Sequence, residues 1–135
     1  MKKFYILIVM ALLPVVVSAY DAKIGRIYYN LNSIAKTAEV TYYIYGGNNN
    51  ELGNSRAYSG DIIIPEEVFY DDITYKVTSI GEAAFGHCNG LTSVTIPNSV
   101  NIIGKKAFCW CSSLTDVPIP NSVTCIGECA FNGCI

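Results

Sequence analysis

The second half of the chain repeats itself with a period of 23 residues. The dipeptide Ile80-Gly81 returns as Ile103-Gly104 and again as Ile126-Gly127. Further positions recur in the same register: Phe85, Phe108 and Phe131; Ala84, Ala107 and Ala130; Cys88, Cys111 and Cys134; and Leu91, Val94, Ile96 and Pro97 with Leu114, Val117, Ile119 and Pro120. A fixed period of about 20 to 29 residues with a Leu-x-x-Val-x-Ile core is typical of a leucine-rich repeat.

The apolar residues of each repeat indicate a short strand with one buried face. Leu91, Val94 and Ile96 point to one side of this strand. Ser93 and Thr95 point to the other side. Since one repeat cannot bury its apolar face alone, we expect the strands to stack in parallel as a solenoid. The return segment is expected to bend at the regularly spaced glycines, to carry its Ala-Phe pair on a short helical turn and to bring Phe108 back over the same core.

The residues before the first full repeat match the pattern more loosely. Residues 61–65 read as another strand of the same kind, ended by a proline. The segment from Pro65 to Gly81 spans sixteen residues, against seven from Pro97 to Gly104. The longer segment predicts a hairpin of residues 68–70 and 73–77 that turns at Asp71-Asp72.

The repeat I-G-x-x-A-F-x-x-C-x-x-L-T-x-V-x-I-P-N-S-V resembles the BspA-like leucine-rich repeats of bacterial surface proteins. This resemblance covers residues 80–135 closely and 58–79 loosely. It implies a mainly β fold with a short leucine-rich-repeat solenoid over residues 61–135, the last repeat being incomplete. It also implies a secreted or cell-surface protein that attaches to proteins of a host or a neighbouring cell.

The N-terminus has the pattern of a secretory signal peptide. Two lysines precede an apolar stretch from Phe4 to Val17, and Val17-Ser18-Ala19 has small residues at the spacing of a cleavage site. The alternative is an uncleaved anchor, but the stretch is shorter than the roughly 20 residues of a membrane-spanning helix. We therefore expect residues 1–19 to be removed on export from a bacterial cell, so that the mature chain begins at Tyr20.

The charge of this mature chain argues against a nucleic-acid partner. Removal of the two leader lysines from nine basic residues leaves seven, against eleven acidic ones. Contact with nucleic acid needs a basic stripe, which such a chain lacks. No apolar segment after Tyr20 is long enough to span a membrane, so no span is expected once the leader is removed.

Residues 20–60 show strand patterns in place of repeats. Residues 25–31 and 37–45 are rich in β-branched and aromatic side chains and are predicted strands. Residues 46–54 have turn chemistry and are expected to form an exposed loop. A solenoid needs its first coil covered, so residues 20–60 are predicted to be an N-terminal antiparallel β cap.

Six cysteines in an exported chain raise the question of disulfides. Cys88, Cys111 and Cys134 stand at the repeat period, so we expect a buried column of thiols. A bridge between neighbours is the alternative, because strands about 4.8 Å apart lie within the Cα separation that a disulfide tolerates. The remaining three, Cys109, Cys125 and Cys129, stand outside this column.

No motif in the chain indicates catalysis, a metal or a cofactor. A zinc site needs a second closely spaced cysteine pair, and the P-loop and dinucleotide fingerprints are missing from the sequence. His87 is the only histidine, and its neighbour Cys88 is a core position, not an exposed nucleophile. An enzyme that uses Cys109 or His87 is the least favoured hypothesis. Trp110 is predicted to be an edge aromatic on the surface.

The leading hypothesis is a protein-binding module. Its candidate binding face consists of the outward strand residues Asp61, Ile63, Ser93, Thr95, Asp116 and Pro118. A second hypothesis is a truncated remnant or capping fragment of a longer repeat protein with no ligand of its own, because Ile135 stands ten residues into a repeat. In that case the open C-terminal edge of the solenoid is expected to favour end-to-end self-association.

Overall fold

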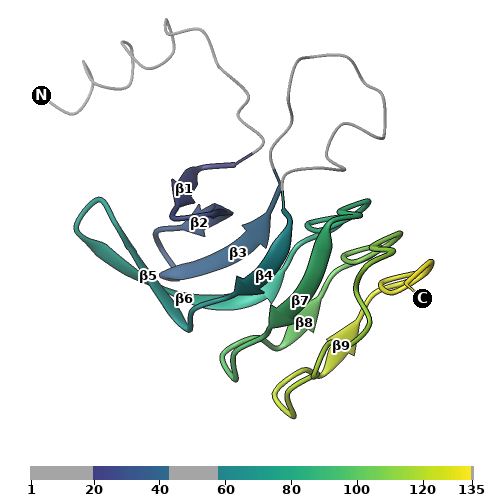
Figure 1. Ribbon diagram of the computed structural model, residues 1–135. Helices are drawn as coiled ribbons and strands as arrows, with labels where there is room; N and C mark the ends of the chain where they lie inside the picture. Colours follow the sequence, from purple (N-terminus) through teal and green to yellow (C-terminus); the bar gives the residue numbers. More distant parts are fainter. Residues whose placement is uncertain (1–19, 43–57, 135) are drawn as a thin grey trace, which may run out of the picture.

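Nine short strands and no helix make up the part of the chain that this computed structural model describes, residues 20–42 and 58–134. The larger sheet has the strand order β1-β2-β3-β6-β8-β9 with β5 paired to β6, and the smaller sheet consists of β4 and β7 (Figure 1). The strands are β1 (Ala22–Ile24), β2 (Ile27–Asn32), β3 (Thr37–Thr41), β4 (Gly60–Ile63), β5 (Glu67–Tyr70), β6 (Ile73–Ile80), β7 (Leu91–Thr95), β8 (Ile102–Ile103) and β9 (Cys125–Ile126).

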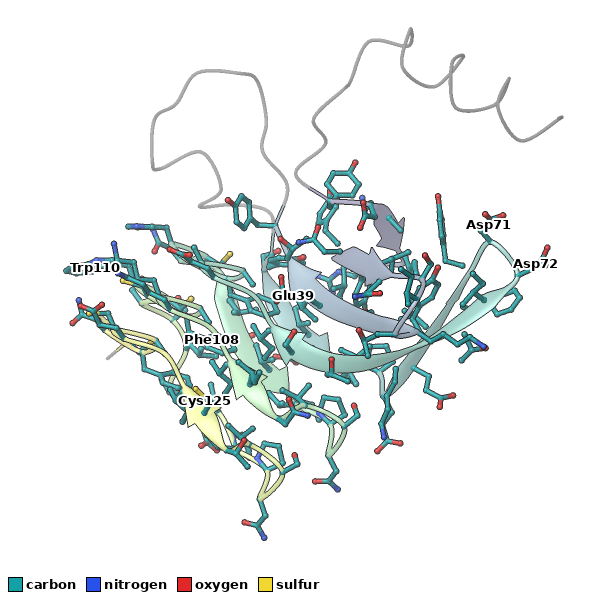
Figure 2. The ribbon with its side chains drawn as sticks, turned by 180° about the vertical axis from the view of Figure 1, so that it is seen from behind. Glu39, Asp71, Asp72, Phe108, Trp110 and Cys125 are labelled. Atoms are coloured by element: carbon teal, nitrogen blue, oxygen red, sulfur yellow. The ribbon has the colours of Figure 1, made fainter. Side chains whose placement is uncertain are left out.

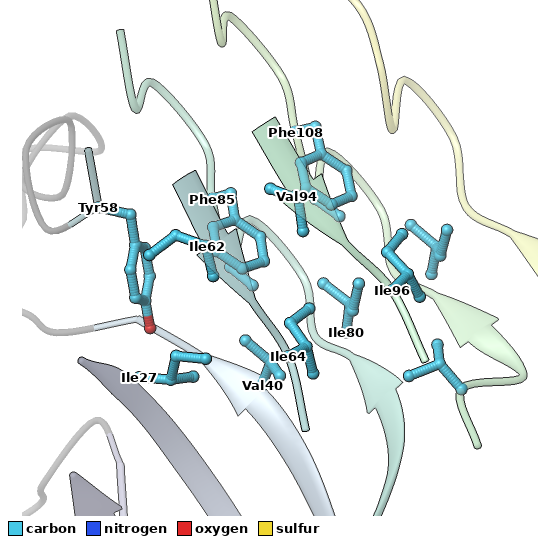
Figure 3. Close-up of a cluster of buried hydrophobic side chains, with 14 of the residues drawn as sticks. Ile27, Val40, Tyr58, Ile62, Ile64, Ile80, Phe85, Val94, Ile96 and Phe108 are labelled. Carbon is cyan, nitrogen blue, oxygen red and sulfur yellow. The ribbon is translucent and has the colours of Figure 1, made fainter. Parts of the chain in front are cut away.

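Each repeat makes one coil that passes through both sheets. Strands β4 and β7 pair in parallel on one side, and β6, β8 and β9 pair in parallel on the other. Apolar side chains from both sides meet in one core, as Figure 3 shows for Ile64, Ile80 and Val94. The predicted mainly β solenoid of parallel strands is confirmed. The sequence did not predict that the return segments form strands of the larger sheet. A strand of two residues, such as Ile102–Ile103, is too short to show an alternating pattern.

The segment after each Ile-Gly pair is a chain of tight turns, where the sequence predicts a short helical turn. Ala83 and His87 have left-handed backbone angles, with φ of 53° and 59°, which interrupt a helix. Alternate backbone N–H groups of this segment bond across to the next coil. These bonds run from Ala83 N–H to Lys105 O, from Phe85 N–H to Ala107 O and from His87 N–H to Cys109 O. The N–H groups of Ala84, Gly86 and Cys88 bond back to residues three positions earlier, so tight turns within the segment alternate with hydrogen bonds between coils.

A column of aromatic rings runs through the core along the solenoid axis. The rings of Phe85 and Phe108 stack with centroids 5.0 Å apart and planes 3° apart. Phe108 and Phe131 repeat this arrangement at 5.1 Å and 6°. Tyr58 extends the column at its N-terminal end, with its ring centroid 4.7 Å from that of Phe85. The predicted core position is confirmed for Phe108 and holds equally for Phe85, whereas Phe131 in the last described coil is half-buried.

The glycine of each Ile-Gly pair lets the coils approach closely. A Cβ atom on Gly104 would lie 2.7 Å from the backbone nitrogen of Glu82 in the preceding coil. Real Cβ atoms essentially never come so close to a backbone atom. The recurrence of glycine at this position therefore follows from coil-to-coil contact.

The smaller sheet has fewer backbone pairings toward its C-terminal end. A regular third strand is expected over residues 114–119, but only an isolated parallel bridge between Ser93 and Asp116 joins this segment to β7. Pro118 stands where β7 has Thr95 and has no N–H to donate to the neighbouring strand. The third coil is held mainly by the larger sheet and by the turns.

The N-terminal residues form an antiparallel meander that continues the larger sheet. Strand β1 pairs with β2 and β2 with β3, and β3 then runs parallel to β6 with Ala38 opposite Val77. The predicted strands at 25–31 and 37–45 correspond to β2 and β3, whereas β1 was not expected from the sequence. Residues 43–45, the predicted loop at 46–54 and the predicted signal peptide at 1–19 lie outside the described residues.

The predicted hairpin between the first two coils is confirmed as β5 and β6. These strands are antiparallel, with Tyr70 opposite Ile73. The two turn residues, Asp71 and Asp72, have φ of 48° and 60° and lie at the hairpin tip (Figure 2). Positive φ at both central residues is the type I′ geometry that matches the twist of a two-residue hairpin.

Candidate functional site

The six residues of the candidate binding face lie on the outward side of the smaller sheet and its continuation. Asp61 is opposite Ser93, and Ser93 in turn is opposite Asp116. Ile63 is opposite Thr95 in the next row. Five of the six side chains are exposed and Ser93 is half-buried. The repeat register therefore brings these residues together in two short rows, which we call the outward face. Pro118 belongs to the third coil, at a position outside regular strand.

A hydroxyl pair holds the carboxylate of Asp61 in place. The hydroxyl groups of Thr92 and Ser93 each donate a hydrogen bond of 2.8 Å to Asp61 Oδ1. These two bonds keep the pKa of the Asp61 carboxyl below its usual range. Thr92 was missed in the sequence analysis, because the irregular register of β7 brings it beside Asp61 and a strict alternation would not. The first row of the outward face thus carries a fixed negative charge.

The second row of the outward face is less polar. Ile63 is 74% exposed, although it is a large aliphatic side chain at the end of β4. Thr95 beside it has its methyl and hydroxyl groups on the same exposed surface. The outward face can therefore accept hydrogen bonds at one row and make apolar contact at the other.

Two of the three column cysteines, Cys88 and Cys111, are buried as the sequence predicts, whereas Cys134 is half-buried. All six cysteines are free thiols, and Cys88 and Cys111 lie in the core. Burial raises the pKa of Cys88 to about 11 and that of Cys111 to about 12. The Cys111 thiol donates to the Phe85 carbonyl oxygen at 2.9 Å, and the Cys134 thiol donates to the Phe108 carbonyl oxygen at 3.1 Å. The column therefore serves packing and satisfies backbone acceptors of the preceding coil.

His87 and the cysteines form no recognisable reactive centre in the described residues. His87 is half-buried beside Cys88, whose raised pKa keeps it a protonated thiol at neutral pH. Within residues 20–42 and 58–134, no group of three or more histidine, cysteine, aspartate or glutamate side chains is arranged to hold a metal ion. The same residues contain no helix long and apolar enough to cross a membrane.

Trp110 is an edge aromatic, as predicted. Its side chain is 52% exposed at the turn of the second coil (Figure 2). The ring lies against Gly133, where a Cβ atom would be 2.7 Å from the indole Cε3 atom. Trp110 lies at the tip of the turns, as Figure 2 shows. It covers the backbone of the next coil.

Comparison with known proteins identifies the repeat region. The family model described as "BspA type Leucine rich repeat region (6 copies)" matches residues 61–135. Among solved structures, a leucine-rich repeat protein from Bacteroides ovatus is 40% identical with a TM-score of 0.70, over 85% of this chain and 27% of that one. A leucine-rich repeat protein from Bacteroides capillosus is 33% identical with a TM-score of 0.63, over 82% of this chain and 72% of that one.

A third solved structure is described as a leucine rich cell surface protein from Faecalibacterium prausnitzii. It is 34% identical with a TM-score of 0.61, over 82% of this chain and 27% of that one. The chain thus spans about a quarter of the length of the Bacteroides ovatus and Faecalibacterium prausnitzii proteins. No curated protein matches this chain.

Proposed function

Since the chain belongs to the BspA type leucine rich repeat family, we propose that it is a non-catalytic protein that binds another protein outside a bacterial cell. One observation carries the proposal: the repeat register lines up Asp61, Ser93 and Asp116 beside an exposed Ile63 on one face. Rows of this kind, displayed on stacked coils, are the surfaces that repeat proteins use for binding. We propose the outward face as the contact surface.

Export to the cell exterior is part of the same proposal. The leader pattern of residues 1–19 and the description of the Faecalibacterium prausnitzii relative as a cell surface protein support it. We further propose residues 20–60 as the cap and residues 61–135 as the binding solenoid. The measurement is the intact mass of the exported protein, which should correspond to a start at Tyr20. A membrane-bound species that retains residues 1–19 would contradict export with cleavage.

Binding through the outward face can be tested with one pair of matched variants. Thr95 and Thr74 are both exposed strand threonines, one on the outward face and one on β6 in the hairpin. Labelled chain is applied to intact epithelial cells and to intact bacterial cells, each with and without trypsin pretreatment. We expect trypsin-sensitive binding that Thr95→Arg weakens about tenfold, the effect of losing about 1.4 kcal/mol. Thr74→Arg should bind normally.

Two outcomes would contradict the proposal. The first is binding that trypsin pretreatment of the cells leaves unchanged, or no binding at all, because the partner is proposed to be a protein. The second is an equal loss for Thr95→Arg and Thr74→Arg, which would place the contact elsewhere on the chain.

Self-association is a second candidate, favoured by the last coil that the structure describes. Ile126 is 50% exposed, whereas its counterpart Ile103 one coil earlier is fully buried. A cavity of about 220 Å³, partly lined by Leu114, Val117 and Phe131, opens on the same end. An apolar strand edge of this kind can pair with a second copy. Sedimentation of the chain should show association that Ile126→Lys reduces, and a natural chain that is monomeric at all concentrations would exclude it.

A further inference from the structure

Strand β4 has one edge that no other strand covers. The Gly60 N–H donates to Gly90 O at 2.8 Å and the Ile64 N–H donates to Thr95 O at 3.0 Å, both toward the β7 side. Because the backbone groups of successive strand residues point to opposite edges, Asp61 and Ile63 direct theirs away from β7. The smaller sheet consists of β4 and β7 alone, so this edge lacks a strand partner in the described residues.

Arg26 covers only part of this edge. Its guanidinium donates to the Ser59 carbonyl oxygen at 2.6 Å and reaches the Asp61 carbonyl oxygen at 3.4 Å. The N–H groups of Asp61 and Ile63 find no acceptor among the residues that the structure describes. The backbone N–H groups at this edge are thus available to a partner, whereas the carbonyl oxygens of Ser59 and Asp61 already accept from Arg26.

The guanidinium of Arg26 also has no carboxylate partner. The ion pair between Lys105 and Glu128 is the only one in the described part of the chain. The Asp61 carboxylate, which lies nearby, accepts its hydrogen bonds from the hydroxyls of Thr92 and Ser93. Arg26 therefore stands at the edge of β4 near the Asp61 carboxylate but without a direct ion pair in the described residues, and it favours a partner that carries a carboxylate.

An apolar groove runs beside the same edge. It has a volume of about 310 Å³ and lies between the β1–β2 turn, β4 and the start of β5. Its apolar lining comes from Ile24, Ile27, Tyr29, Ile62, Ile63, Pro65 and Val68. A groove of this size can hold one or two aliphatic side chains. Their transfer from water into the groove favours binding.

We propose that an extended segment of a partner protein adds to the free edge of β4 as a further strand. Its carbonyl oxygens accept from the N–H groups of Asp61 and Ile63, an aliphatic side chain enters the groove, and a carboxylate pairs with Arg26. Strand addition of this kind combines backbone hydrogen bonds for affinity with a side-chain pocket for selectivity. The inference deepens the proposed protein-binding function by naming the chemistry of the segment that is bound.

The probe is an acetylated and amidated peptide, Thr-Val-Glu-Val-Thr, added to the isotope-labelled chain and followed by NMR. We expect saturable binding in which the amide hydrogens of Asp61 and Ile63 exchange at least about tenfold more slowly. A version of the peptide with N-methylated valines has methyl groups in place of two backbone N–H hydrogens, which obstruct its approach as a strand, and it should bind about tenfold more weakly. This comparison needs no change in the protein, so it is independent of folding.

Two variants at one position test the edge itself. Ile63→Pro removes an N–H that points away from β7, and proline is tolerated at such edge positions. Ile63→Val keeps the N–H and a similar side chain. Peptide binding should fall about tenfold in Ile63→Pro and stay near that of the natural chain in Ile63→Val. The Ile64 amide, which bonds to β7, reports that the variant remains folded.

The charge is tested with a glutamine version of the peptide. It should bind several-fold more weakly than the glutamate peptide on the natural chain, and the two should bind equally to Arg26→Gln. The proposal is overturned by three results: no saturable binding of the glutamate peptide, equal binding of the N-methylated peptide, or equal binding by Ile63→Pro and Ile63→Val. Thr95→Arg should leave peptide binding intact, so failure here is distinguishable from failure of binding at the outward face.

Discussion

The repeats and the N-terminal meander bury their side chains in two different ways. In the repeats, each core residue packs on its own copy one coil away, as Phe85 does on Phe108 and Ile80 on Ile103. In the meander, unlike residues meet, and side chains complete the backbone hydrogen bonds. The same side-chain contacts therefore recur from coil to coil, whereas the meander packs on the first coil through contacts that occur only once.

Tyr58 is the residue at which these two regions join. Its ring occupies the head of the phenylalanine column, 4.7 Å from Phe85. Its buried hydroxyl donates to the Thr41 carbonyl oxygen at 2.7 Å and accepts from the Tyr28 N–H at 3.0 Å. One side chain thus continues the repeat on its apolar side and satisfies the meander on its polar side.

The largest expected effect is from removing the middle ring of the column. Phe108 is fully buried and stacks on both sides. Phe108→Ala should lower the free energy of unfolding by about 4 kcal/mol, because it leaves a cavity between two coils. Denaturant unfolding measures it, with the exposed Phe69→Ala as the control. A loss below about 1 kcal/mol would show that the coils do not depend on the column.

A pair of glycines compares the two regions directly. Gly104→Ala forces a methyl group against the backbone of the preceding coil, and we expect a loss of about 3 kcal/mol. Gly25→Ala, in the turn between β1 and β2, meets nothing within 4 Å but has a φ of 61°. It should cost only about 1 kcal/mol, from backbone strain. Thermal unfolding of both variants checks the order, and equal losses would refute the close packing of coils.

The junction at Tyr58 should respond to the loss of one oxygen. Tyr58→Phe keeps the ring but leaves the Thr41 carbonyl and the Tyr28 N–H without this partner. We expect a loss of about 2 kcal/mol in the free energy of unfolding. Hydrogen exchange of the Tyr28 amide should quicken more than that of amides in β7. Tyr42→Phe, at a half-buried tyrosine on the same strand end, is the control, and an equal effect there would argue against a specific junction.

The smallest effect concerns pH and the cysteine column. Burial raises the pKa of Cys88 to about 11, above the ordinary value of 9.0 that applies in the unfolded chain. The folded state therefore resists ionisation, so stability is intact below pH 9 and falls as the pH rises from 9 toward 11. At pH 9.5 this thiol should account for a loss of under about 1 kcal/mol.

The thiol contribution is isolated by two serine variants. Cys88→Ser should flatten the alkaline decline in stability, because a hydroxyl does not ionise in this range. Cys125→Ser, at an exposed position, should leave the decline unchanged. Denaturant midpoints between pH 8 and 10.5 provide the measurement, and identical profiles for the two variants would exclude the buried thiol as the cause.

The sequence by itself determined the repeat and much of its local structure. The 23-residue period predicts the parallel stacking, the buried phenylalanines and the rows of residues on the outward face. Each coil contacts a copy of itself, so the residues that make these contacts recur at the repeat period. The hairpin at Asp71-Asp72 was equally readable, since turn chemistry is local.

Only the tertiary structure decided how the array begins and where its strand edge is left open. The bonds of Arg26 to Ser59 and of Tyr58 to Tyr28 join residues about thirty positions apart in the sequence. Each such contact occurs once, so no period, spacing or alternation in the sequence predicts it. The second sheet also came from the structure alone, because its strands in the later coils are two residues long and are defined by their neighbours and not by their own pattern.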